Sequence, residues 1–150
     1  MPDPLRLLAL HSDDGVLVEP EWLARAEGVH RELRTQLEPD YPRQMQRVVR
    51  DGARMTIAIR DDRVVGVAVH RVYENTCDGR HLYVDDLVTA ASARSSGVGR
   101  ALLADLERRA RAQGCTRMTL DSGTQRSGAH KFYFREGYVV SGFHFRKELA

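Results

Sequence analysis

The sequence lacks the features of a membrane, exported or disulfide-linked protein. None of its apolar runs approaches the roughly 20 residues that a helix needs to cross a bilayer. Its N-terminus lacks the charged, apolar and small-residue segments of a signal peptide. The two cysteines, Cys77 and Cys115, have no motif spacing, so neither a disulfide framework nor a metal site is indicated. These absences predict a cytoplasmic protein that uses no membrane and no metal.

A strong charge of one sign is also missing. There are 23 Lys and Arg residues against 21 Asp and Glu, for a net charge of +2, which is too balanced to indicate nucleic-acid binding. The arginine-rich run at 108–111 lies among acidic residues, and we interpret it as a solvated helix face. The sequence has no GxxxxGK[ST] loop, no complete GxGxxG and no GxSxG, so an NTPase, a dinucleotide-binding enzyme and a hydrolase have little support.

The 150 residues suffice for one domain with a sizeable core, and we expect a single domain over 1–150. Apolar periodicity predicts helices at 19–37, 43–50, 98–113 and 127–136 and strands at 5–10, 55–59, 64–73, 82–89, 117–121 and 138–145. The strands between 55 and 89 read as an antiparallel meander. The 16-residue helical run between 82–89 and 117–121 predicts a βαβ crossover with parallel strands.

One segment carries most of the functional information, because it follows a strand-like run and opens a helical one. Its residues are Arg94, Ser95, Ser96, Gly97, Val98, Gly99 and Arg100. The glycines leave the backbone bare and free in φ, so several N–H groups can converge where the positive end of the helix dipole points. The flanking arginines can add charge-assisted contacts. The pattern favours a cradle for a phosphate or pyrophosphate, although a purely structural turn has the same appearance.

The pattern Arg-x-x-Gly-x-Gly after a strand resembles the acyl-CoA-binding signature of the GNAT superfamily of N-acetyltransferases. The resemblance covers residues 5–147, and the order β-α-α-β-β-β-α-β-α-β is that of a GNAT domain. It implies an α+β fold in which helices flank a mixed, mostly antiparallel twisted sheet with one βαβ crossover. It also implies that the 94–100 segment holds the pyrophosphate of acetyl-CoA by its backbone amides.

The segment 129–138 carries a second resemblance, to the GNAT pattern A-x-x-F-Y-x-x-x-G-[FY]. In this family the tyrosine points at the sulfur of coenzyme A, which implies that Tyr133 protonates the leaving thiolate. A phenol with a pKa of about 10 is protonated at pH 7 and suits this role. The alternative is a tyrosine that packs in the core. The family often has an asparagine at the position of Arg126, and this departure leaves the pantetheine contact unassigned, with Gln125, Arg126 and Ser127 as candidates.

The strand before the signature supplies the third piece. The GNAT pattern places an acidic residue three positions before the last apolar or small residue of the strand, which assigns Asp86. We predict a general base, directly or through water, or an anchor for the substrate ammonium; the alternative is a carboxylate that pairs with an arginine. The strand usually carries a bulge, and the backbone at Leu87, Val88 and Thr89 would receive the pantetheine and the acetyl oxygen. Alternation turns Asp85 away from Asp86 unless a bulge re-aims it.

Together these motifs predict direct transfer of an acetyl group from acetyl-CoA to the primary amine of a small molecule or peptide. A sensor domain of the same fold that binds acetyl-CoA without catalysis is the alternative, and the intact Tyr133 argues mildly against it. The acceptor cannot be identified from the sequence. Dimers are common among proteins of this type, so the sequence is compatible with a homodimer and does not decide the oligomeric state.

Overall fold

The computed structural model describes residues 1–150 as two compact units, Met1–Thr119 and Leu120–Ala150. Every predicted helix is present, and so is every predicted strand up to residue 121. The elements in chain order are β1 (Arg6–Ala9), α1 (Pro20–Leu33), α2 (Tyr41–Arg50), β2 (Arg54–Arg60), β3 (Arg63–Asn75), β4 (Gly79–Thr89), the 3₁₀ turn η1 (Ala91–Ala93), α3 (Val98–Ala112), β5 (Arg117–Leu120) and α4 (Ser127–Arg135).

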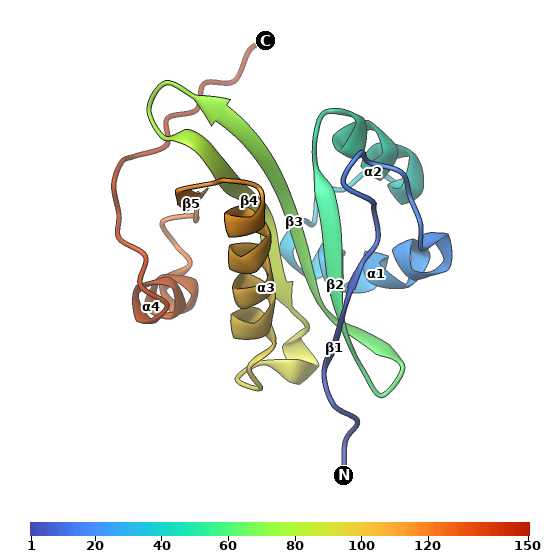
Figure 1. The fold of residues 1–150 in the computed structure, drawn as a ribbon. Helices are drawn as coiled ribbons and strands as arrows, with labels where there is room; N and C mark the ends of the chain where they lie inside the picture. The colour runs from blue at the N-terminus through green and yellow to red at the C-terminus, as the bar shows by residue number, and fades with distance from the viewer. The chain divides into compact units, whose positions relative to one another are not determined.

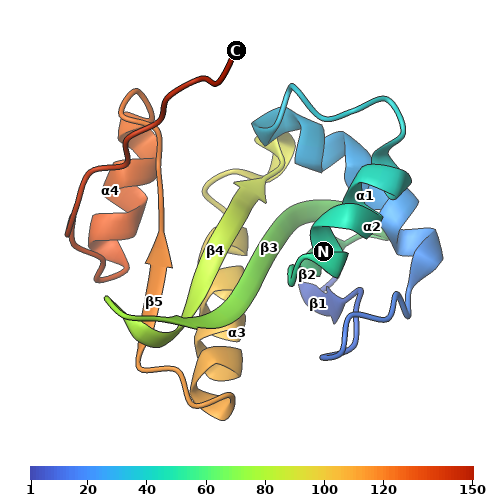
Figure 2. The same cartoon turned by 90° about the horizontal axis from the view of Figure 1, so that it is seen from above.

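The strands form one sheet in the order β1-β2-β3-β4-β5. From β1 to β4, each strand pairs antiparallel with the next. The arrows of β4 and β5, which are connected through α3, point the same way (Figure 2). This is the mixed, mostly antiparallel sheet with one βαβ crossover that the sequence predicts, and the α+β fold class is confirmed.

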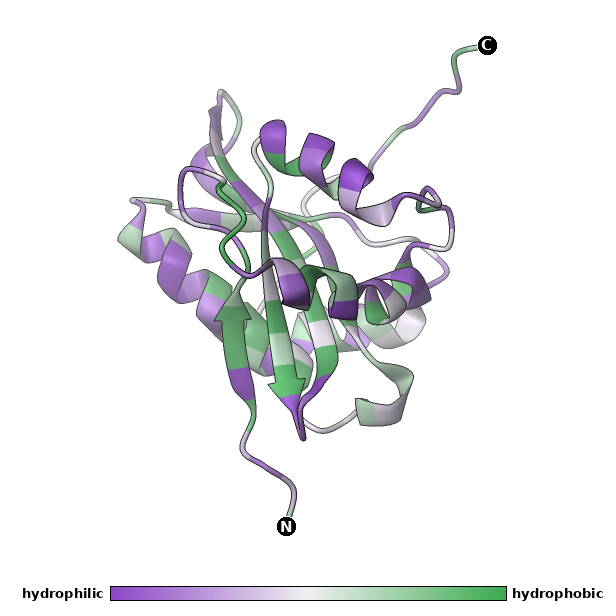
Figure 3. Ribbon diagram, turned by 90° about the vertical axis from the view of Figure 1, so that its right-hand side faces the viewer, coloured by the Kyte–Doolittle hydropathy of each residue, from purple (hydrophilic) through white to green (hydrophobic).

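Helices cover both faces of this sheet, with α1 and α2 on one face and α3 on the other (Figures 1 and 2). The strands are the most hydrophobic part of the ribbon (Figure 3). Alternate residues of β2 and β3, among them Ile57, Val67 and Val69, are buried in a core with Ala26 and Val29 of α1. The amphipathic pattern that predicts α1 therefore also predicts the face that it buries.

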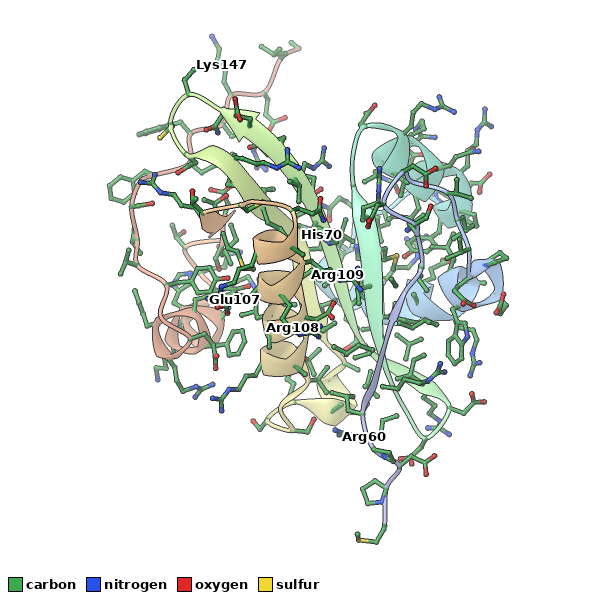
Figure 4. The ribbon with its side chains drawn as sticks, in the orientation of Figure 1. Arg60, His70, Glu107, Arg108, Arg109 and Lys147 are labelled. Carbon is green, nitrogen blue, oxygen red and sulfur yellow. The ribbon has the colours of Figure 1, made fainter.

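Helix α3 approaches the sheet closely because β3 has a glycine beneath it. A Cβ atom on Gly66 would lie 2.6 Å from Cγ1 of Val98. Farther along α3 the same face has a cavity of about 70 Å³, whose lining includes His70 and Arg109, and these two residues lie near each other in Figure 4. Burial and the charge of Arg109 lower the pKa of His70 to about 4. His70 is therefore a neutral imidazole at pH 7.

Two helix ends differ from the prediction for local reasons. Helix α1 ends at Leu33 rather than near residue 37, and Leu37 packs against the core from the loop that follows. Helix α2 begins at Tyr41 rather than at 43, because the carboxylate of Asp40 accepts a hydrogen bond from the backbone N–H of Arg43 at 3.2 Å. Such a cap satisfies one of the free N–H groups at a helix start.

The strand predicted at 138–145 is wrong, because residues 138–150 form neither helix nor strand. Their apolar side chains, including Val139, Val140, Phe143 and Phe145, are exposed. An alternating apolar pattern measures how well a segment suits a sheet face, but a strand exists only where a neighbour supplies the hydrogen bonds. None of the helices is both long and apolar enough to span a membrane.

Candidate active site

The turn between β4 and α3 has the backbone shape that the glycine pattern predicts. After η1, Arg94 is extended, Ser95 has a φ of 61° and Gly97 has a φ of 83°. The hydroxyl of Ser96 donates a hydrogen bond to the carbonyl of Ala93 and so closes the turn on itself. A left-handed conformation is strained for residues with a Cβ, and Gly97 meets this requirement directly before the first residue of α3.

The N-terminus of α3 lacks a side-chain cap. No side chain accepts a hydrogen bond from its first turn, and the first N–H groups of any helix have no partner within the helix. A Cβ atom on Gly97 would have no heavy atom within 4 Å, so the space beside the turn is open. Open space, unpaired N–H groups and the positive end of a 15-residue helix together make a site that can hold an anion.

A β-bulge in β4 controls the direction of the neighbouring carboxylates. Val69 of β3 pairs with Asp86, but the next residue, His70, pairs with Val84, so Asp85 is the extra residue. Val69 belongs to the core under α1, whereas His70 lines the cavity under α3. Without the bulge, Asp86 would share the α3 face with Val84. The bulge turns Asp86 toward α1.

The carboxylate of Asp86 is held by two residues of the α1 segment. Its Oδ2 lies 2.8 Å from Nε2 of His30, and its Oδ1 accepts a hydrogen bond from Nε of Arg34 at 2.5 Å. The other ring nitrogen of His30 lies 2.9 Å from the hydroxyl of Tyr41. The side chain of His30 is 1% exposed and that of Asp86 is 14% exposed. A polar chain therefore runs from Tyr41 in the core through His30 to Asp86.

Opposing effects act on the pKa values in this chain. Burial acts to raise the pKa of Asp86, but the hydrogen bonds and charges of His30 and Arg34 outweigh it and hold the pKa below its usual range. Burial and the charges of Glu27 and Asp86 raise the pKa of Tyr41. Nδ1 of His30 lies beside the hydroxyl of Tyr41, and Nε2 lies beside the carboxylate of Asp86. Asp86 is consequently an ionised carboxylate and a weak base at neutral pH.

Asp85 forms a separate ion pair with Arg71 of β3. The guanidinium donates from Nε and Nη2 to the carboxylate, with distances between 2.5 and 3.1 Å. The simple alternation that would turn Asp85 away from Asp86 does not hold here, because the bulge interrupts it. Arg34 also bridges the two residues, since its Nη2 donates to the backbone carbonyl of Asp85 at 2.9 Å.

The remaining site residues follow from these elements. Leu87, Val88 and Thr89 complete β4 and pair with β3, and the 94–100 segment continues the same stretch of chain. Arg126, Ser127 and Tyr133 belong to the second unit. There, Arg126 stands at the N-cap of α4 and Ser127 is the first helical residue. Tyr133 is buried, and its ring packs against that of Tyr138 with the centroids 5.7 Å apart.

Sequence reasoning missed His30 and Arg34. A signal was present, because residues 26, 30 and 34 recur at four-residue spacing and Ala26 is buried. A histidine and an arginine that continue the buried face of a helix need polar partners. The partner, Asp86, reaches that face only through the bulge, which apolar periodicity does not reveal. The GNAT resemblance implied a bulge in this strand, and the pairing of β3 with β4 confirms it.

The chain matches known proteins over most of its length. The family model described as Acetyltransferase (GNAT) family matches residues 20–138. An uncharacterized N-acetyltransferase of Bacillus subtilis, YhdJ, is 32% identical over 139 residues, which cover 86% of this chain and 92% of that protein. An aminoalkylphosphonate N-acetyltransferase of Salmonella typhimurium is 34% identical over 101 residues, which cover 62% of this chain and 61% of that protein.

Solved structures agree with this fold. A Trypanosoma brucei acetyltransferase superposes with a TM-score of 0.77 at 23% identity, over 97% of this chain and 100% of that one. An aminoglycoside N-acetyltransferase in complex with CoA superposes with a TM-score of 0.79 at 19% identity, over 97% and 96% of the two chains. The family model and the Bacillus relative each span well over half of the sequence, and the chain therefore belongs to the GNAT family of acetyltransferases.

Proposed function

We propose that this N-acetyltransferase takes its acetyl group from acetyl-CoA held at the turn between β4 and α3, and passes it directly to a primary amine near Asp86. The observation that carries the proposal is the continuity of the two features. The bulge that presents Asp86 and the uncapped start of α3 at Gly97 lie on one stretch of chain. A single stretch can thus place a thioester and an amine side by side.

In this proposal, the backbone N–H groups of the 94–100 segment bind the pyrophosphate, and Arg94 and Arg100 add charge-assisted contacts. The backbone at Leu87, Val88 and Thr89 binds the pantetheine arm and polarises the acetyl carbonyl. Arg126 or Ser127 supplies a further contact to the pantetheine. Acetyl-CoA is a co-substrate that brings the activated thioester, and the reaction needs no metal.

Starting from the ammonium form, the chemistry removes two protons from the nitrogen and delivers one to the sulfur. Asp86 binds the ammonium form, which loses its proton to water or to Asp86 itself before the attack. The neutral amine adds to the carbonyl carbon, the new C–N bond forms and the C–S bond breaks. Tyr133 then donates its phenolic proton to the thiolate, and the second proton that the nitrogen loses on forming the amide passes through solvent to restore the phenol. The lowered pKa of Asp86 favours anchoring of the amine over strong general-base catalysis.

The test is a direct one on the wild-type protein. Acetyl-CoA should raise the melting temperature by mass action, and free thiol should appear when an amine is added. The Salmonella relative is named for aminoalkylphosphonates, so these compounds are the first acceptors to try, followed by amino acids, polyamines, aminoglycosides and peptides. Thermal stabilisation without thiol release from any amine would favour a sensor domain, and no stabilisation at millimolar acetyl-CoA would contradict the co-substrate assignment.

A further inference from the structure

Two carboxylate–arginine pairs lie next to each other at the β4 bulge. Asp86 pairs with Arg34, and Asp85 pairs with Arg71. The two guanidinium groups also meet at one residue, because Arg34 donates to the backbone carbonyl of Asp85 and Arg71 to its carboxylate. All four side chains come from the first unit. The bulge therefore gathers two positive and two negative charges in a small area.

The exposed charges in this group are the positive ones. The side chains of Arg34 and Arg71 are 41% and 29% exposed, whereas those of Asp86 and Asp85 are 14% and 17% exposed. A ligand that approaches Asp86 from solvent therefore meets guanidinium groups first. The Nε–Nη2 edge of each guanidinium is engaged by Asp86 and Asp85, and Nη1 of Arg71 also donates to the carbonyl of Asp51 at 3.2 Å. A guanidinium carries five N–H donors, so the N–H groups that remain can bind the oxygens of a carboxylate or phosphonate.

Asp86 still has acceptor capacity for an ammonium group. An ionised carboxylate offers about four lone-pair positions, and His30 and Arg34 each use one oxygen of Asp86. The four formal charges of the group sum to zero. A zwitterion matches this arrangement, with its ammonium on Asp86 and its acidic group on the arginines. A polycation has no acidic group to place beside the guanidinium groups of Arg34 and Arg71. The exposed Asp51 is a further carboxylate whose charge acts on Arg71.

We infer that the acceptor is a zwitterionic amine, which carries a carboxylate or phosphonate on a short arm, and that Arg71 together with Arg34 selects the acidic group. This inference rests on the proposed function, since it names the substrate class of the same site. A change at Arg34 would also disturb Asp86, which it binds, so Arg71 is the better residue for testing specificity.

The experiment compares acceptors that differ only in the second charge. 3-Aminopropylphosphonate is paired with propylamine, β-alanine is paired with β-alaninamide, and spermidine represents the polycations. Thiol release gives kcat and KM for each. We expect kcat/KM for the acid-bearing amines to exceed that of their neutral partners by about 10-fold or more, mainly through KM, because hydrogen bonds to charged groups are the stronger ones. Calorimetry with 3-aminopropylphosphonate in the presence of coenzyme A measures binding without turnover.

Three variants test the role of Arg71. In Arg71→Gln the ratio between acid-bearing and neutral amines should fall toward one, and in Arg71→Lys it should fall less, because the charge remains while the number of N–H donors falls. Arg111→Gln is the matched control, since Arg111 pairs with Glu107 on the exposed side of α3 and should retain the full ratio. Arg71→Lys keeps a partner for Asp85, so it remains informative if Arg71→Gln does not fold.

The possible outcomes distinguish an error in the substrate class from an error in the proposed function. Equal kcat/KM within each pair, or a preference for spermidine, would overturn the zwitterion assignment and leave acetyl transfer intact. If acetyl-CoA binds but no amine in the panel reacts, the calorimetry decides: heat of binding supports the inference, and its absence overturns it. No stabilisation by acetyl-CoA and no thiol release would overturn the proposed function as well.

Discussion

At the scale of single residues, the polar chain from Tyr41 to Asp86 shows how burial and pairing divide the chemistry. His30 is nearly inaccessible to solvent and contacts Asp86 from the core side. The exposed edge of the carboxylate is therefore left for a ligand. A carboxylate held by two donors keeps one geometry, which favours precise placement of an amine over uptake of its proton. The proposed role of Tyr133 differs from that of Asp86: Tyr133 must transfer a proton, whereas Asp86 holds the amine in place.

Substitution of Tyr133 by Phe tests whether this residue is the proton donor. The change keeps the ring and its packing against Tyr138 and removes only the hydroxyl. We expect turnover to fall by about 10²–10⁴-fold, the usual cost of losing a general acid. Acetyl-CoA affinity, measured on the same variant, should change far less. Turnover within about threefold of wild type would remove Tyr133 from the mechanism.

Substitution of Asp86 by Asn separates anchoring from base catalysis. The amide keeps the shape and removes the charge, so we expect KM for the amine to rise by about 10-fold or more while acetyl-CoA affinity stays close to wild type. A general base predicts a different result: a loss in kcat that recovers partly at higher pH, where more amine is already neutral. Steady-state kinetics from pH 7 to 9 distinguish the two. Full activity at pH 7 would leave Asp86 with a structural role alone.

At the scale of elements, periodicity explains why most of the fold was predictable and why one part of the site was not. Helices α1 and α3 each bury one face, and strands β2 and β3 are buried on both faces in their central parts. A sequence displays the first as helical periodicity and the second as short apolar runs. The β4 bulge breaks the rule by one residue. Strict alternation groups Asp86 with Leu82 and Val84, on the face opposite to the one that it occupies. The mispredicted strand at 138–145 is rich in β-branched and aromatic residues, yet these residues form neither helix nor strand, because composition alone does not make a strand.

The start of α3 gives a prediction at this scale. Gly97→Val forces a branched side chain into a left-handed conformation and fills the open space beside the first N–H groups. We expect the thermal stabilisation by acetyl-CoA to be largely lost. Gly79→Val is the matched control, because Gly79 also has a positive φ and open space, and it lies at the other end of β4. If both variants retain the same stabilisation, the cradle lies elsewhere.

At the scale of the whole molecule, helix α3 belongs both to the core and to the turn at 94–100 that we propose binds acetyl-CoA. Val98 is the first residue of α3 and is 1% exposed, and it lies directly over Gly66 of the sheet. The expectation that residues 1–150 act as a single domain stays a prediction. Within the first unit, the same helix closes one face of the sheet and presents its N-terminus to the proposed pyrophosphate.

The response of global stability to acid follows from the cavity under α3. An unfolded histidine has a pKa of about 6.5, whereas burial and Arg109 lower the pKa of His70 to about 4. Below pH 6.5 the unfolded chain therefore binds a proton that the folded chain does not, and stability falls as the pH drops toward 4. The loss from this residue is about 2 kcal/mol at pH 5. Urea unfolding of wild type and His70→Gln between pH 5 and 7 should give a shallower slope for the variant; equal slopes would contradict the assignment.

The contact between Val98 and the sheet has a consequence for the thermodynamics of binding. Because folding already fixes the first turn of α3, the entropy of ordering the anion site is lost when the protein folds and not when the ligand arrives. The site should behave as a preorganised receptor, whose affinity depends little on induced ordering. By linkage, a change beneath α3 that loosens the helix would weaken acetyl-CoA binding without touching a single ligand contact.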